Sequence, residues 1–351
     1  MSLVAVWSDG YLAHDANWLI WAGVRLPGDE EADRAEILRA ELRRAGVQIM
    51  AADEHDRSHI EAVHDPSMLD YLEHAYSGWV EAGYPVEPGS DRVVAYAFPH
   101  PNAFGAYPPR EPRSRAALAG VYCMDTATTI GPGTYRGARA AVDGALSAAA
   151  LVRSGHRAAY APVRPPGHHA GTSYFGGSCY LNNAAIAAEW LSGQDAGPVA
   201  IVDIDAHHGN GTQQIFYQRG DVHYLSIHVD PAEGWFPHWC GFPEETGTGE
   251  GTGANLNLPL TPGSGDAVFC SALDQVCARV ADLDPGFLVV SLGVDAGASD
   301  SESPLQVTNQ GFAEIGGLLA SLGLPTLLIQ EGGYDLGALG GDVMAVLSAF
   351  A

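Results

Sequence analysis

From residue 135 onward, the chain alternates short apolar runs with helical or loop segments. The runs are rich in Val, Ile, Leu and Ala, and they span residues 158–163, 199–204, 222–227, 287–292 and 326–329. Continuous apolar runs of this length are typical of strands that are buried on both faces. Strands that alternate with helices form parallel sheets, so the pattern predicts an α/β fold whose sheet is covered by helices on both faces.

The first half of the chain is less regular. Residues 1–7 are apolar and lack a basic flank, which predicts a first strand rather than a signal peptide. Helical patterns occupy 30–45, ending at Gly46, then 58–76, and later the alanine-rich stretch 136–153, which stops at Gly155. Three histidines lie among polar residues of the second stretch and are predicted to be surface or packing groups: His59, His64 and His74.

Residues 77–120 interrupt the helical pattern with prolines, glycines and six aromatic side chains. A segment of this length within a compact chain is usually either functional or disordered, and the aromatic residues argue against disorder. We therefore expect one domain over residues 1–351, with this insertion acting as a lid or an oligomer contact.

Charge and composition narrow the function. The chain has 351 residues and a net charge of −25, and all 17 basic residues are arginines. Such a surface repels nucleic acid and anionic lipid and attracts cationic substrates, although acidity that only aids solubility is an open alternative. No apolar stretch is long enough to span a membrane. The five cysteines are odd in number and form no CxxC pair, which favours a reducing cytoplasm over a disulfide framework.

Charged side chains gather where the second apolar run ends. Asp203, Asp205 and His207 alternate there, and residues two apart on a strand point the same way. Burying such groups is costly unless they are paired or bind a metal, so Asp205 and His207 are predicted metal ligands. A hydrolytic zinc site needs three protein ligands and one open position. Asp295, which follows another apolar run, is the best third candidate, with a helix cap or turn residue as its alternative role.

Further polar groups follow the other runs. His168 and His169 come after a Pro-Pro-Gly turn, and Asp203 and Asn210 are candidate partners that would give the two rings different pKa values. A second metal site or a surface pair is the alternative. Tyr334 follows two glycines and is a candidate for stabilising an oxyanion, or else a packing residue. The ligands of open α/β sheets bind at these carboxyl ends of strands. The glycine-rich segment 247–253 lacks the context of a nucleotide site and is predicted to be a loop.

Several motifs in order resemble one known superfamily over roughly residues 120–335. They are RPPGHHA (164–170), CYLNNAAIAA (179–188), DIDAHHGNGTQQIFY (203–217), SIH (226–228) and EGGY (331–334), together with the segment around Asp295. They closely resemble the histone deacetylase and acetylpolyamine amidohydrolase superfamily. The resemblance implies an arginase-like α/β fold with a mainly parallel eight-stranded sheet, and zinc-dependent hydrolysis of an acetylated amine.

The resemblance also implies a role for each matching residue. It makes Asp205, His207 and Asp295 the zinc ligands, His169 the general base and acid, and His168 its electrostatic partner. It pairs Asp203 with His168 and Asn210 with His169, and it makes Tyr334 the residue that polarises the carbonyl. It further implies a structural K⁺, several of whose ligands are backbone oxygens, at Asp203, Asp205, His207, Ser226 and Ile227.

Two positions depart from the motifs. Ser178 stands where relatives place Phe or Tyr beside the acyl channel, so we expect a wider or more polar channel with Phe236 as its opposite wall. Gly177 and Asp125 complete the expected substrate-binding residues. Asn210 stands where many eukaryotic relatives have Asp, and the resemblance implies that catalysis survives this change.

The insertion resembles that of acetylpolyamine amidohydrolases, which implies a homodimer with a narrowed entrance. We expect a cytoplasmic deacetylase of a small acetylated amine, such as an acetylpolyamine, that releases acetate. Glu87, Glu111 or Asp125 could bind a distal ammonium. Acetyl-lysine in proteins and an acylated secondary metabolite are alternative substrates. An arginase-type ureohydrolase or a binding protein without activity is a more distant alternative.

Overall fold

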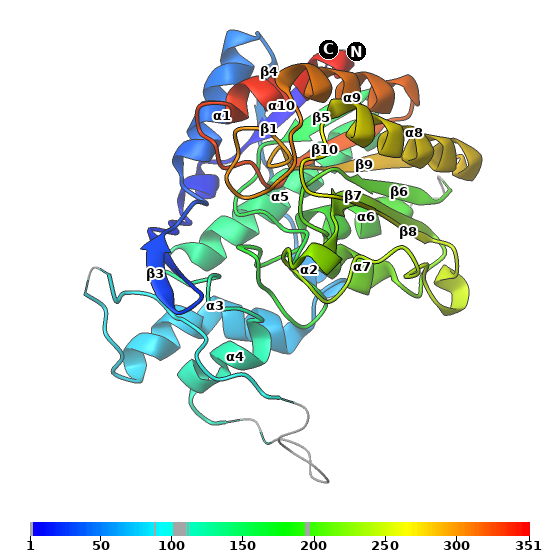
Figure 1. Cartoon of the computed structure of the whole chain (residues 1–351). Coiled ribbons are helices and arrows are strands. Elements are labelled where there is room, and N and C mark those ends of the chain that lie inside the picture. The colour runs from blue at the N-terminus through cyan, green and yellow to red at the C-terminus, as the bar shows by residue number, and fades with distance from the viewer. Residues whose placement is uncertain (1–2, 88, 101–109, 111, 194–196) are drawn as a thin grey trace.

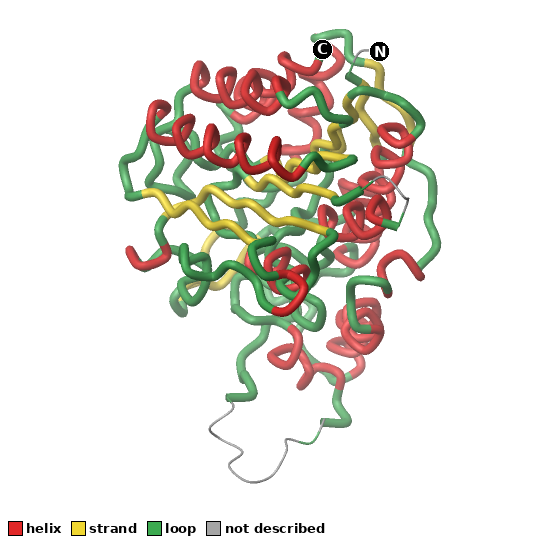
Figure 2. The backbone as a smooth tube through the Cα atoms, turned by 90° about the vertical axis from the view of Figure 1, so that its right-hand side faces the viewer, coloured by secondary structure: helices red, strands yellow, loops and turns green. Residues whose placement is uncertain are grey.

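A parallel sheet forms the centre of the computed structural model, which describes residues 3–87, 89–100, 110, 112–193 and 197–351. Within these residues the sheet has eight strands, all parallel to their neighbours (Figures 1 and 2). This confirms the predicted α/β class. The strands, in their order across the sheet, are β4 (Gln48–Ala51), β1 (Val4–Trp7), β5 (Ala158–Ala161), β10 (Thr326–Gln330), β9 (Phe287–Leu292), β6 (Val199–Asp203), β7 (Val222–Val229) and β8 (Asn255–Leu260).

Each face of the sheet is buried under helices. Successive side chains of a strand point to opposite faces, so in β6 Val199 and Ile201 pack into one core, and Ala200 and Val202 into the other. The two faces therefore need separate helical layers. One layer contains α1 (Asp33–Arg44), α8 (Asp266–Leu283), α9 (Asn309–Ser321) and α10 (Leu339–Leu347). The other contains α2 (Ser58–Glu61), α3 (Pro66–Glu81), α4 (Ala119–Tyr122), α5 (Thr134–Arg153), α6 (Asn183–Ser192) and α7 (Asn210–Phe216).

Two of the expected helices differ from the sequence prediction. The stretch predicted as one helix over 58–76 is two helices, because Asp65 is extended and its side chain accepts a hydrogen bond from the Ser67 N–H. Pro66 then occupies the first turn of α3, and a residue before proline disfavours the helical conformation. The first predicted helix begins at Asp33 rather than at residue 30. This leaves Glu30 outside the helix.

The strand β7 is longer than the apolar run that predicted it. His228 belongs to the strand and is buried, with its Nδ1 2.7 Å from Ser226 Oγ and its Nε2 2.9 Å from the Gly241 carbonyl oxygen. The apolar run over 222–227 predicted that the strand ends before His228, and this prediction is wrong. Its ring packs instead on His208, with the two centroids 4.7 Å apart.

A small hairpin lies outside the main sheet and faces the inserted segment. The hairpin consists of β2 (Trp18–Trp21) and β3 (Val24–Pro27), paired antiparallel. Trp18 Nε1 donates a 3.3 Å hydrogen bond to Asp91 of the insertion. Residues 101–109 and 111, which include Glu111, lie outside the described residues, and the lid or oligomer contact stays a prediction.

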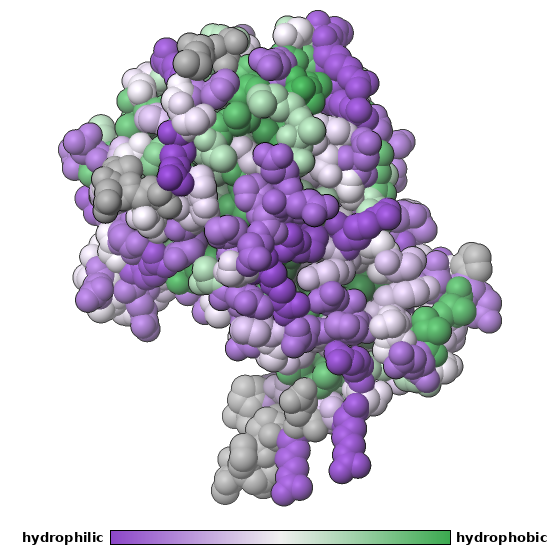
Figure 3. Space-filling model, turned by 180° about the vertical axis from the view of Figure 1, so that it is seen from behind, coloured by the Kyte–Doolittle hydropathy of each residue, from purple (hydrophilic) through white to green (hydrophobic). Residues whose placement is uncertain are grey.

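The outer surface is largely hydrophilic on one face of the molecule (Figure 3). Hydrophilic side chains extend across the middle of the face seen in Figure 3, and hydrophobic ones gather in smaller patches beside them. Among the helices that the structure describes, none combines the length and the apolar character that crossing a lipid bilayer requires.

Candidate active site

Two neighbouring strands, β6 and β9, bring the three predicted metal ligands together. Asp205 and His207 follow β6, and Asp295 follows β9. His207 Nδ1 lies 3.2 Å from Asp205 Oδ1 and 3.0 Å from Asp295 Oδ2. One potential ligand atom from each residue falls within 4.8 Å of the other two. Both carboxylates are buried.

The surroundings of this group suit a divalent cation. A Cβ on Gly293 would lie 2.1 Å from an oxygen of Asp205, and one on Gly332 would lie 2.3 Å from an oxygen of Asp295. Only glycine leaves the carboxylates this space. Burial, and then the charge of Asp205, raise the pKa of Asp295 to about 7. A bound cation would offset this repulsion, and two carboxylates with one imidazole are a donor set that Zn²⁺ accepts.

The two adjacent histidines have different partners. His168 Nδ1 lies 3.0 Å from Asp203 Oδ2, and His169 Nδ1 lies 2.7 Å from Asn210 Oδ1. Burial lowers the pKa of His168, but the carboxylates of Asp205 and Asp203 outweigh it and raise this pKa to about 10. Burial, followed by the charge of His168, lowers the pKa of His169 well below its usual value. The imidazole of His168 is therefore the more basic of the two and that of His169 the less basic, which agrees with the prediction that the pair would have different pKa values.

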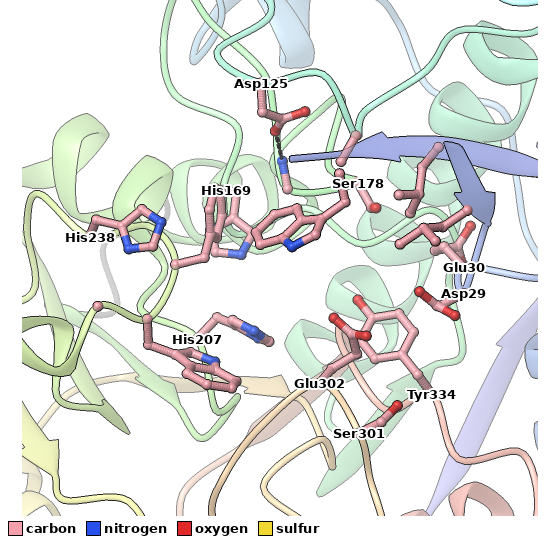
Figure 4. A pocket seen from close by; sticks show the side chains of 18 residues that line it. Asp29, Glu30, Asp125, His169, Ser178, His207, His238, Ser301, Glu302 and Tyr334 are labelled. Atoms are coloured by element: carbon pink, nitrogen blue, oxygen red, sulfur yellow. Dashed lines mark hydrogen bonds between the residues drawn. The ribbon is translucent and has the colours of Figure 1, made fainter. Parts of the chain in front are cut away.

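A cavity of about 350 Å³ opens above these groups (Figure 4). His169, His207 and Tyr334 line it. In the close-up, the two imidazoles and the phenol come from different parts of the chain and surround one space. Its walls also include aromatic and apolar side chains, among them those of Leu19, Trp21, Leu26, Trp235 and Phe236. The cavity is thus a single space in which a metal, a base and a phenol could act on one molecule.

All four residues expected to bind substrate line this cavity. The Phe236 ring meets His169 edge-on, with centroids 4.9 Å apart. Gly177 has φ +57°, and a Cβ there would lie 2.3 Å from His169 Cδ2, so glycine is required. Asp125 accepts hydrogen bonds from Gly177 N at 2.6 Å and from Thr128 N at 2.7 Å. Asp125 therefore supports the turn that carries Ser178 as well as lining the cavity.

The support of Tyr334 was not predicted from the sequence. The buried Arg34 donates to the carbonyl oxygens of Gly333 at 2.7 Å and Glu331 at 2.6 Å, and its guanidinium lies 4.7 Å from the centroid of the Tyr334 ring. Glu30 accepts a 2.9 Å bond from Arg34 and two bonds of 2.8 and 2.7 Å from Arg164. In the sequence, Arg34 resembles any other arginine of an amphipathic helix, so no pattern indicated that it would contact the segment that carries Tyr334.

Two carboxylates at the cavity were also missed. Asp29 and Glu302 line it, and Figure 4 shows both on the same side as Tyr334. Burial, and then the charge of Asp29, raise the pKa of Glu302. Within the part of the chain that the structure describes, neither carboxylate is in an ion pair with an arginine. The expected candidate Glu87 is exposed and does not line the cavity.

Comparisons with known proteins agree with this fold and identify the family. The family model for the histone deacetylase domain matches residues 29–350. The chain is 39% identical over 347 residues to the acetylpolyamine amidohydrolase of Mycoplana ramosa, a match that covers 99% of each chain. It is 38% identical over 349 residues to acetylpolyamine amidohydrolase 1 of Pseudomonas aeruginosa, again with 99% coverage of both.

A solved structure extends the similarity to three dimensions. The crystal structure of acetylpolyamine aminohydrolase from Burkholderia pseudomallei matches with a TM-score of 0.93 at 37% identity, covering 99% of this chain and 98% of that one. The resemblance that the sequence motifs indicated is confirmed along nearly the whole chain. The chain belongs to the histone deacetylase domain family.

Proposed function

We propose that the chain is a zinc-dependent amidohydrolase that removes the acetyl group from a small acetylated amine, an acetylpolyamine. The observation that carries this proposal is the position of Asp205, His207 and Asp295 beside His169 and Tyr334 at one cavity. Family membership supports deacetylase activity in general. The names of the relatives, which are acetylpolyamine amidohydrolases, support the substrate class.

In this proposal His169 carries out both proton transfers of the reaction. Zn²⁺ held by Asp205, His207 and Asp295 would polarise the acetyl carbonyl and acidify a water molecule. The Nδ1–H group of His169 donates a hydrogen bond to Asn210 Oδ1, so the Nε2 atom carries no proton. Nε2 is therefore free to accept a proton from the attacking water. The same nitrogen then protonates the leaving amine, so that acetate and a free amine are released.

Tyr334 would act on the other side of the carbonyl. Burial raises the pKa of its hydroxyl well above 10, although Arg34 opposes this effect. The phenol therefore keeps its proton and can donate a hydrogen bond to the carbonyl oxygen as negative charge develops there. Arg34 also binds the backbone on either side of Gly332, and this contact holds the phenol at the cavity.

The charge around the cavity favours a cationic substrate. The carboxylate of Glu30 is neutralised by two arginines, and that of Asp125 is occupied by backbone N–H groups. Asp29 and Glu302 remain to bind a distal ammonium, which a polyamine carries and a simple acetamide lacks. The structural K⁺, the homodimer and the cytoplasmic location remain predictions within this proposal.

Ser178 favours a second candidate substrate, an acylated metabolite with a bulkier body. It lines the cavity where relatives are expected to place an aromatic ring. Its backbone N–H donates to Thr128 Oγ1 at 2.9 Å, and its φ is +61°. A small side chain there leaves one wall of the channel open to a branched group.

The test is hydrolysis by the zinc-reconstituted protein of four substrates: N-acetylputrescine, monoacetylspermidine, an acetyl-lysine peptide and the neutral N-butylacetamide. We expect turnover of both acetylpolyamines and its loss in Tyr334→Phe. Glu302→Gln should raise KM about three- to tenfold for the charged substrates and leave N-butylacetamide unaffected, because only an ammonium contacts that carboxylate. Glu314→Gln, on α9, is the matched control.

Each outcome separates the candidates. If only the acetyl-lysine peptide were hydrolysed, the proposed substrate would be acetyl-lysine in proteins instead of an acetylpolyamine. Failure to hydrolyse any of the four with zinc bound would refute the acetylpolyamine proposal and leave the bulkier metabolite. An equal effect of Glu302→Gln on charged and neutral substrates would remove the ammonium-binding role.

A further inference from the structure

A chain of hydrogen bonds leads from the catalytic histidine to a tyrosine outside the substrate cavity. His169 Nδ1 meets Asn210 Oδ1 at 2.7 Å, and Asn210 Nδ2 donates to the Tyr174 hydroxyl at 3.1 Å. That hydroxyl in turn donates to the carbonyl oxygen of Asn210 at 3.4 Å. Met124 Sδ, a weak acceptor, lies 3.9 Å from the same amide nitrogen. Both neighbours of Asn210 Nδ2 therefore accept hydrogen bonds.

The direction of these hydrogen bonds matters because an amide has one oxygen that accepts and one NH₂ group that donates, whereas a carboxylate has two equivalent oxygens. With Oδ1 toward the ring, His169 carries its proton on Nδ1 and keeps Nε2 free to accept another. If the amide were reversed, its NH₂ group would face Nδ1 and favour the tautomer that is protonated on Nε2. That tautomer cannot take a proton from water. The orientation of Asn210 thus selects between an active and an inactive form of the base.

We propose that Tyr174 is a positioning residue that fixes the amide orientation of Asn210 and, through it, the tautomer of His169. In the observed orientation, the hydroxyl accepts from Asn210 Nδ2 while donating to the backbone carbonyl. In the reversed orientation, its single proton would have to serve either Oδ1 or that carbonyl, and one hydrogen bond would be lost. The consequence for catalysis rests on the proposed function, in which His169 accepts a proton.

Tyr174 is separate from the substrate. It does not line the cavity that holds His169 and Tyr334, but lines another on the far side of Asn210, together with Gln213, Tyr217 and Cys240. Removing its hydroxyl should therefore lower kcat and leave KM unchanged. An aspartate at position 210 would present two equivalent oxygens to the ring, and with that residue the enzyme should not need Tyr174.

The experiment is a double-mutant cycle. We expect Tyr174→Phe to lower kcat about five- to tenfold, the effect of one hydrogen bond, without changing KM. In the Asn210→Asp background the same substitution should have no further effect. Tyr217→Phe, which removes a hydroxyl from the same cavity without a bond to Asn210, is the matched control. Equal losses in both backgrounds would indicate a merely structural role and overturn the proposal.

A second readout does not depend on activity. In protein labelled with ¹⁵N-histidine, the ring nitrogens of His169, assigned by comparison with His169→Ala, should show the Nδ1–H form in the wild type. Tyr174→Phe should shift this population toward the Nε2–H form, and an unchanged tautomer would overturn the proposal. If the wild type hydrolysed none of the substrates, the proposed function would fail, while the tautomer measurement would still decide the role of Tyr174.

Discussion

Replacing Glu30 with glutamine should destabilise the protein far more than a single lost surface contact. Glu30, Arg34 and Arg164 are each at most 2% exposed, and the one carboxylate serves both guanidinium groups. Glutamine keeps the volume and removes the charge, which leaves two buried cations without their counter-ion. Breaking a buried ion pair by removing one partner costs about 3–5 kcal/mol. We expect a loss of that size in the free energy of unfolding, measured by urea denaturation.

The matched control is Glu61→Gln, which removes the same charge from a partly exposed pair with Arg57. Because exposed pairs contribute little, its effect should stay below about 1 kcal/mol. Glu30→Gln should also lower kcat, since Arg34 supports the backbone before Tyr334. Equal urea midpoints for the two variants would refute the assignment of Glu30 as the counter-ion that holds this region together.

Three further predictions address the channel, the metal and pH. Ser178→Phe should favour linear over branched substrates, with Ser178→Ala as its control, and an unchanged substrate ratio would exclude Ser178 from setting the channel width. Chelation of the metal should lower the melting temperature. Adding Zn²⁺ at a hundredfold excess over its Kd should restore about 2.7 kcal/mol of the free energy of unfolding. If the Asp295→Asn variant responded to Zn²⁺ in the same way, the metal would bind elsewhere. Burial lowers the pKa of His64 to about 4 in the folded protein. Between about pH 6.5 and about pH 4 the unfolded chain therefore binds a proton on this ring that the folded state does not. The free energy of unfolding should fall by up to about 3 kcal/mol as the pH drops through this range. His64→Gln should flatten that pH dependence, and an unaltered slope would contradict this origin.

The central strands could be predicted from the sequence, but the two edges of the sheet could not. Strands β5, β6, β7, β9 and β10 are buried on both faces and therefore appear as apolar runs. The edge strand β8 alternates Asn255 and Asn257 with leucines and contains Pro259, so it shows neither a continuous run nor an uninterrupted strand pattern. The opposite edge, β4, is short and largely exposed. Because the edge strands are less buried than the central ones, they lack the continuous apolar runs by which the central strands were predicted.

The candidate site divides in a similar way. The metal-binding group and the histidine pair follow strands in short motifs, and the shared edge of a parallel sheet brings them together. Arg34, Asp29 and Glu302 reach the same region from a helix and from loops, with no fixed spacing to those motifs. Their contribution depends on long-range packing. Sequence pattern alone therefore found the proposed chemistry and missed the side chains that support Tyr334 and set the charge of the entrance.

The hairpin of β2 and β3 gives this protein a degree of modularity. It adds Leu19, Trp21 and Leu26 to the cavity wall but no strand to the central sheet. It is attached through Trp18 to Asp91 of the inserted segment, and the carbonyl oxygens of Trp18 and Ile20 accept hydrogen bonds from Thr129 and Thr126. None of these bonds involves the metal-binding strands. Substitutions in the hairpin can therefore reshape the entrance at little cost to the catalytic framework. Substrate preference and hydrolytic chemistry are thus free to evolve on different parts of one chain.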